Sequence, residues 1–203
     1  MPLQKTRQFQ SPFTFLVGML VMASSPAASA HEAVGSAAGF VSGFTHPFLG
    51  WDHLVAMVAV GIWGAFLGAP AIWMLPVLFP LVMAAGGGLG VVGVELPAVE
   101  AGIALSAIVL GSMIAAALRP PLWVAILLVG VFAVFHGHAH GTELPDAANP
   151  LTYSLGFVVA TGLLHVSGIG IGSLVQWPAG RVIVRVLGAA IALVGVGFLV
   201  GSA

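Results

Sequence analysis

The chain of 203 residues contains no cysteine and very few charged residues. Without thiols it can form no disulfide framework, no thiolate zinc site and no iron–sulfur cluster. Only 5 lysines and arginines are present, too little positive charge for a nucleic-acid-binding protein. Together with 6 acidic residues they give a charged share of 5%, against about 25% in soluble globular domains. The sequence therefore excludes an ordinary soluble domain.

Apolar residues are correspondingly abundant. They make up 60% of the chain, and the mean hydropathy is +1.14. Because a membrane-spanning helix needs about 20 mostly apolar residues, we expect an all-α, polytopic membrane protein. Six transmembrane helices are predicted, in this order: Trp51–Ala69, Ala71–Val94, Ala101–Leu118, Leu122–His140, Leu151–Val175 and Val182–Val200.

The first thirty residues have the pattern of a secretory signal. Lys5 and Arg7 form a positive region, Phe13–Ala23 is apolar, and Ala28-Ser29-Ala30 is a small-residue cleavage pattern. We therefore predict a cleavable signal peptide over residues 1–30 and a six-helix transmembrane domain over residues 31–203. An uncleaved anchor helix is the alternative interpretation of the same residues.

The remaining charges predict the orientation. With the mature N-terminus outside, every basic residue falls in a cytoplasmic link, in agreement with the positive-inside rule: Arg119, Arg181 and Arg185. The acidic links then lie outside, with Glu95 and Glu100 in one and Glu143 and Asp146 in the other. An even number of spans places both mature termini outside.

The first polar motif, His46-Pro-Phe-Leu-Gly-Trp-Asp52-His53, lies at the outer start of the first span. Pro47 and Gly50 predict a turn, and Asp52 falls in the opening helical turn, where the helix dipole stabilises a carboxylate. A turn followed by a helix start can gather His46, Asp52 and His53 around one point. Taken singly, Asp52 fits a helix cap and His46 an interfacial polar residue. The preceding apolar segment, residues 33–44, fits either a half-helix in the outer leaflet or a surface helix.

The second motif, His136-Gly-His138-Ala-His140-Gly-Thr-Glu143, closes the fourth span at the same outer face. On a helix His136 and His140 share a face, whereas His138 points elsewhere. Imidazole suits nickel, cobalt, copper and zinc ions. A loose histidine-rich tract is the alternative. Because the topology brings both motifs to one membrane boundary, the sequence predicts a site for a metal cation there.

Three further residues are candidate metal ligands. His165 lies within the fifth span, where it fits either an ion relay or a hydrogen bond between helices. Glu100 opens the third span and can attract cations or be a solvated loop charge. His31 would carry a free α-amine after cleavage and could then chelate a metal.

These motifs resemble a known family. The pattern His46-Pro47-x-x-Gly50-x-Asp52-His53 is similar to one signature of the HupE/UreJ family of nickel/cobalt permeases. Phe135-His136-Gly137-x-Ala139-His140-Gly141-x-Glu143-x-Pro145 is similar to the second signature, and Val99-Glu100-x-Gly102-Ile103-Ala104-x-Ser106 to the third span of that family. The resemblance covers essentially the whole mature chain.

The resemblance implies ATP-independent uptake of Ni²⁺ or Co²⁺ across a bacterial inner membrane, with both mature termini periplasmic. The metal is cargo, so no cofactor is expected. The implied metal ligands are His46, Asp52, His53, His136, His140 and Glu143, while His138 occupies a variable position. Hydrogenase or urease, with their metallochaperones, would receive the metal. A homo-oligomer is compatible with the sequence.

Two other classes of function remain open. An intramembrane metalloenzyme could use the same ligands to activate water, but the chain has no H-E-x-x-H motif. A membrane metal sensor or donor would bind the ion without transporting it. An ATP-driven pump is not indicated, because the chain has no G-x-x-x-x-G-K-[ST] phosphate loop.

Overall fold

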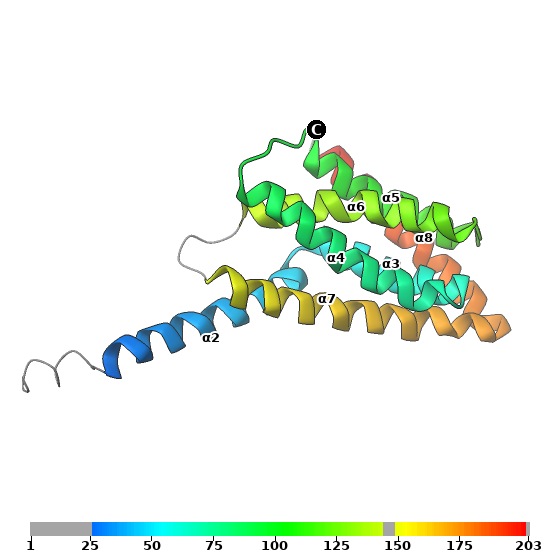
Figure 1. The fold of residues 1–203 in the computed structure, drawn as a ribbon. Coiled ribbons are helices and arrows are strands. Elements are labelled where there is room, and N and C mark those ends of the chain that lie inside the picture. The colour runs from blue at the N-terminus through cyan, green and yellow to red at the C-terminus, as the bar shows by residue number, and fades with distance from the viewer. Residues whose placement is uncertain (1–25, 144–148, 202–203) are drawn as a thin grey trace, which may run out of the picture.

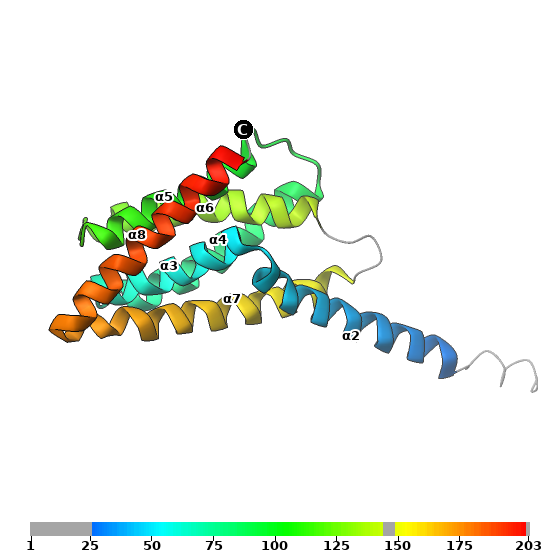
Figure 2. The same ribbon diagram turned by 180° about the vertical axis from the view of Figure 1, so that it is seen from behind.

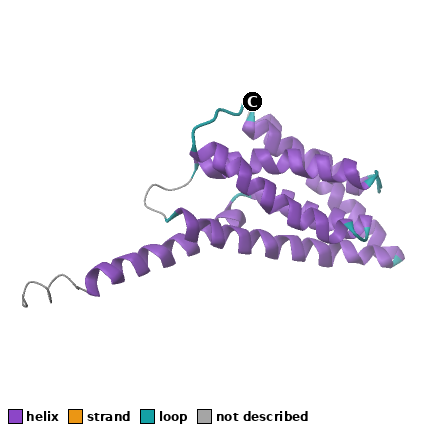
Figure 3. Cartoon of the chain, in the orientation of Figure 1, coloured by secondary structure: helices purple, strands orange, loops and turns teal. Residues whose placement is uncertain are grey.

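In the computed structural model the chain forms a bundle of α-helices. Residues 26–143 and 149–201 are described, with side chains from residue 37 onward. Within those ranges the elements are helices and the connections between them are short (Figure 3). In chain order they are α2 (Pro26–Leu49), α3 (Trp51–Leu67), α4 (Ala71–Val91), α5 (Val99–Ala115), α6 (Leu122–Thr142), α7 (Pro150–Gly172), the 3₁₀ helix η1 (Ser173–Gln176) and α8 (Pro178–Gly201).

The six expected helices are present as α3 to α8, with ends a few residues from the predicted ones. Four of them, α4, α6, α7 and α8, are long and apolar enough to cross a membrane. Helices α3 and α5 have 17 residues each, fewer than the about 20 of a full span. Helix α3 reaches that length only together with α2, from which it is bent by 82°. The described chain therefore offers four spans, or five with this bent pair, and belongs to the multi-pass membrane proteins.

The structure tests only some of the predictions for the N-terminal region. Residues 1–25 lie outside the described residues, and Ala28–Ala30 fall in the first turns of α2, so the signal peptide stays a prediction. Residues 33–44 belong to α2, which extends away from the bundle (Figure 1). Our expectation that Pro47 shapes a turn is wrong, because Pro47 lies inside α2. A proline this close to the end of a helix breaks only one hydrogen bond, and the chain turns at Gly50 alone.

Helices α3 to α8 run in alternating directions, so their ends gather into two groups (Figure 1). One group, which we call the histidine end, holds the starts of α3, α5 and α7 and the ends of α4, α6 and α8. The other, the arginine end, carries Arg119, Arg181 and Arg185. The Arg185 Nε donates a hydrogen bond to the carbonyl of Ala115 over 2.8 Å, which satisfies an otherwise unpaired group at the end of α5.

Glycines bring the helices into close contact. Helix α7 packs along α3, α6 along α4, and α8 along α5, as the view from behind shows for the last pair (Figure 2). On α7, a Cβ atom at Gly168 would meet the carbonyl of Val58 on α3 and lie 3.0 Å from the Cα of Gly61. Because lipid supplies no hydrophobic drive between helices, such small-residue contacts are what holds spans together.

This packing leads to a matched pair of substitutions. Gly168→Ala should destabilise the protein by about 1–3 kcal/mol, because its methyl group overlaps the backbone of α3. At Gly162 on the same helix, an added Cβ would have no heavy atom within 4 Å. Gly162→Ala should therefore leave the stability of the protein unchanged or slightly raised. Thermal unfolding in detergent measures both. Equal unfolding temperatures for the two variants would contradict the close contact between α3 and α7.

Candidate metal site

At the histidine end, one residue from α2 meets two from the end of α6. The His46 Nε2 lies 3.6 Å from the Glu143 Oε2. With His140 these residues form a group whose ligand atoms all lie within 4.8 Å of one another. An ion held at about 2.1 Å from each ligand keeps its ligands within about 4.2 Å. The three side chains therefore need to approach one another by about an ångström to share one ion.

The start of α3 orients a second imidazole. Asp52 Oδ1 accepts hydrogen bonds from the backbone N–H of His53 and from its Nδ1, each at 2.9 Å. The carboxylate thus fixes the proton on Nδ1 and leaves the lone pair of Nε2 free. The His53 Nε2 is buried and has no hydrogen-bond partner among the described residues. A carboxylate behind a histidine is the usual arrangement around a metal-binding imidazole, because it raises the basicity of the ligand.

A serine on α5 orients the third imidazole in the same way. The Ser106 hydroxyl donates to the carbonyl of Ile103 at 2.6 Å, so its oxygen must accept the hydrogen bond of 2.9 Å with the His136 Nε2. The proton of His136 is therefore on Nε2. The His136 Nδ1 keeps its lone pair, and in the described part of the chain it is buried without a partner.

The rings of these histidines form one continuous cluster. Ring centroids lie 4.9 Å apart for His46 and His140, 4.4 Å for His53 and His140, and 4.9 Å for His53 and His136. Both ring nitrogens of His140 are buried and unpartnered in the described chain. The cluster thus gathers several lone pairs with one nearby carboxylate, at the mouth of an apolar bundle, which is the chemistry of a borderline divalent cation.

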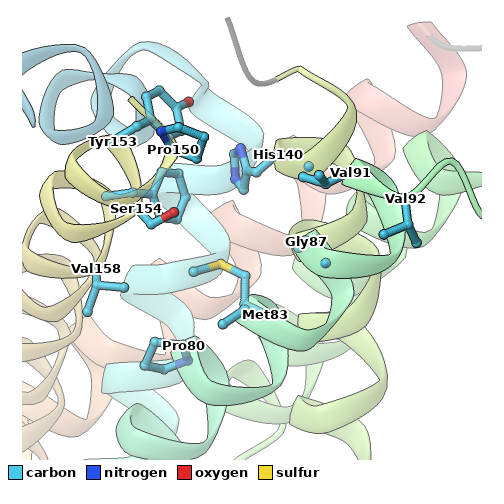
Figure 4. A pocket seen from close by; sticks show the side chains of 15 residues that line it. Pro80, Met83, Gly87, Val91, Val92, His140, Pro150, Tyr153, Ser154 and Val158 are labelled. Carbon is cyan, nitrogen blue, oxygen red and sulfur yellow. The ribbon is translucent and has the colours of Figure 1, made fainter. Parts of the chain in front are cut away.

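Aromatic and apolar side chains line one side of this cluster. The Phe157 ring on α7 lies 4.2 Å from the His140 ring, centroid to centroid. A cavity of about 350 Å³ lies between α4 and α7 beside His140. Figure 4 shows Tyr153 and Val91 at its outer part, and Pro80 and Val158 at the opposite, inner part. His140 therefore faces both the cluster and a mostly apolar space.

The structure separates the remaining candidates from this cluster. The His138 Nε2 donates to the carbonyl of Val94 over 2.7 Å, so His138 holds the link after α4, on another face of α6. Glu100 lines a cavity of about 280 Å³ with Asp52, on the side of α5 and α8. His165 lies deeper, and its ring is 5.5 Å from that of Phe79. The side chain of His31 is outside the described residues.

Sequence reasoning missed Ser106 as a site residue. It lies in the stretch of the third span that resembles the family, but a serine in an apolar helix is common and no spacing rule links it to His136. The only local indication is that Ser106 lies one turn after Gly102, another buried residue, on the same face of α5. Its role becomes visible only when α5 is placed against α6.

Comparisons with known proteins identify the family of the chain. The family model described as HupE / UreJ protein matches residues 4–198. Protein HupE of Rhizobium leguminosarum bv. viciae is 50% identical over 173 residues, which cover 85% of this chain and 91% of that protein. No solved structure matches the chain.

The hydrogen bond from His136 to Ser106 yields a prediction. Ser106→Ala removes the acceptor that fixes the proton of His136, so the ring can present either nitrogen to the cluster. We expect nickel affinity to fall about 10- to 100-fold, as for other residues that orient a metal ligand. The measurement is a nickel titration of the detergent-purified protein.

Ser112→Ala provides the control for that titration. Ser112 is an exposed residue of the same helix, so its loss should leave the affinity unchanged. If Ser106→Ala also bound nickel with the original affinity, the proposed orientation of His136 would be refuted.

Proposed function

Because this chain belongs to the HupE/UreJ family, we propose that it is a permease for Ni²⁺, and also for Co²⁺, in the bacterial inner membrane. The observation that carries the proposal is the cluster of His46, His53, His136 and His140 with Glu143 at one end of an apolar bundle. The imported metal would supply hydrogenase or urease, through metallochaperones on the cytoplasmic side. Both mature termini would be periplasmic.

The outer ligands would replace the water around the ion in steps. Glu143 and His46 are partly exposed, with 51% and 34% of their side chains accessible, so they would meet a hydrated cation first. His140, His53 and His136 are buried and would exchange further water molecules for nitrogen. Distributing dehydration over several ligands avoids a single large barrier, as in other ion-conducting proteins.

The membrane potential can supply the driving force. An inside-negative potential favours entry by about 2.3 kcal/mol per charge for each 100 mV, and by about twice that for a divalent ion. Transport would therefore need no ATP. Imidazoles bind a metal ion in their neutral form, so protons compete with the ion for these ligands.

The orientation rests on the two charge groups. The arginine end would face the cytoplasm, since cytoplasmic links carry the excess of basic residues. The histidine end, with Glu95, Glu100 and Glu143, would face the periplasm. Acidic side chains on that side would raise the local concentration of cations at the entrance.

The central prediction concerns uptake of radioactive nickel into cells. His46→Ala should lower uptake at low nickel concentration at least about tenfold, because it removes one first ligand. Uptake by the unsubstituted chain should also decline as the pH is lowered and protons compete with the metal for the imidazoles. Ser112→Ala is the control, since this exposed residue of α5 lies outside the cluster.

The same assay distinguishes transport from binding alone. A membrane sensor or a metalloenzyme would bind nickel without accumulating it, so uptake would not depend on the chain. Normal uptake by His46→Ala would remove the cluster from the proposal.

The orientation is testable because the chain has no native cysteine. In intact spheroplasts, a membrane-impermeant maleimide should label Glu95→Cys and should not label Pro120→Cys until the membrane is opened. The opposite pattern would reverse the proposed direction of transport.

A further inference from the structure

Helix α4 contains two prolines four residues apart, Pro76 and Pro80, and nevertheless continues from Ala71 to Val91. A proline has no N–H, so the carbonyl four residues before it has no partner in the helix. Pro80 leaves the carbonyl of Pro76 without its helical hydrogen bond, and Pro76 does the same to Ile72. At membrane depth, such carbonyls are tolerated only where they are buried in protein or line a polar space.

The ring of His165 on α7 faces the carbonyl of Pro76. Neither ring nitrogen makes a hydrogen bond of regular geometry within the described residues, although the side chain is only 1% exposed. One turn earlier on the same face of α7, the hydroxyl of Thr161 is also fully buried and unpartnered there. In the described chain, His165 and Thr161 thus leave buried polar atoms on one face of α7 without regular hydrogen bonds, and the Pro76 carbonyl opposite His165 lacks its helical partner.

Buried polar atoms without partners are rare, and each one calls for a ligand, an ion or an ordered water. The unpaired atoms of His165 and Thr161 therefore indicate a bound polar partner between α4 and α7.

This set lies on the inner side of the histidine cluster. Phe79 is fully buried, and its ring lies 5.5 Å from that of His136 and 5.5 Å from that of His165. One aromatic ring therefore separates the two groups of polar side chains. The cavity beside His140 extends between the same two helices as far as Pro80 (Figure 4), next to Phe79 in the chain.

We propose that Thr161, His165 and the carbonyl of Pro76 form a second, inner cation site, which receives the ion after it leaves the histidine cluster. The proposal rests on the proposed function for the identity of the cargo, a divalent borderline cation such as Ni²⁺. One imidazole and two neutral oxygens leave further positions to water. Because no carboxylate takes part, this site holds the ion more weakly than the outer one and releases it toward the arginine end.

Pro80 and the two side chains on α7 supply the variants for the test. Pro80→Ala restores an N–H that engages the carbonyl of Pro76 and removes it from the inner site. We expect Pro80→Ala, Thr161→Val and His165→Phe to lower the maximal rate of nickel uptake by at least about tenfold. Ser167→Ala is the control and keeps the rate of the unsubstituted chain, because its exposed hydroxyl bonds only the carbonyl of Leu163 on its own helix.

The concentration dependence of uptake separates the inner site from the outer one. The half-saturating nickel concentration should stay unchanged in the three inner variants, because the outer cluster sets it, and should rise in His46→Ala. Equal rates for Pro80→Ala and Ser167→Ala, or a normal rate for His165→Phe, would overturn the inner site and leave the outer one standing. No uptake by the unsubstituted chain would instead refute the proposed function.

A gain-of-function variant covers the case in which the inner variants fold poorly. In this cysteine-free chain, Thr161→Cys places a thiolate beside His165, a pair that prefers zinc. Zinc should then inhibit nickel uptake at concentrations that do not affect the unsubstituted chain, and adding His165→Phe should abolish this inhibition. Unchanged zinc sensitivity in Thr161→Cys would show that only water occupies the space, against the proposal.

Discussion

The arrangement of the helices depends on one constraint, the need of buried imidazole nitrogens for partners in an apolar bundle. In two of the rings, one of the two nitrogens finds a hydrogen-bond partner inside the protein. His53 donates to Asp52 and His136 donates to Ser106, each through one nitrogen. The other nitrogen of each ring is left as a lone pair directed away from these partners. Donor bonds to fixed acceptors therefore hold each ring in one tautomer, with the lone pair of its other nitrogen available to a cation.

Close packing makes this gathering of rings possible. Helices α4 and α6 approach through Gly87 and Gly141, where a Cβ on Gly141 would meet the backbone of Gly87. Helix α2 lies against α7 in the same way, through Gly43 and Gly156. With larger residues the helix axes would stand farther apart. The histidines of α2, α3 and α6 would then lose contact with one another, so glycines far from any ligand atom still determine the geometry of the site.

Much of the fold could be predicted from the sequence, because long apolar runs separated by prolines have few alternatives to membrane helices. The meeting of the two histidine motifs followed from counting spans, since an even number of crossings returns the chain to the same side. A turn at Gly50 was predicted. The continuation of α2 through Pro47 was not predictable, since it depends on packing against α7. The pairing of Ser106 with His136 and the position of Phe79 depend on the rotation of each helix about its axis. Hydropathy and spacing contain no information on that rotation. The cleavable signal and the metal-binding roles of individual residues stay predictions.

The bent junction at Gly50 has a consequence for biosynthesis. Helices α2 and α3 leave the ribosome well before α6 and α7, so His46, Asp52 and His53 enter the bilayer without their later neighbours. All three lie near the ends of α2 and α3 and not at the centre of a long apolar helix, where polar side chains cost most to insert. Only insertion of the α6–α7 hairpin brings them together with His136 and His140, so the histidine cluster forms late in synthesis.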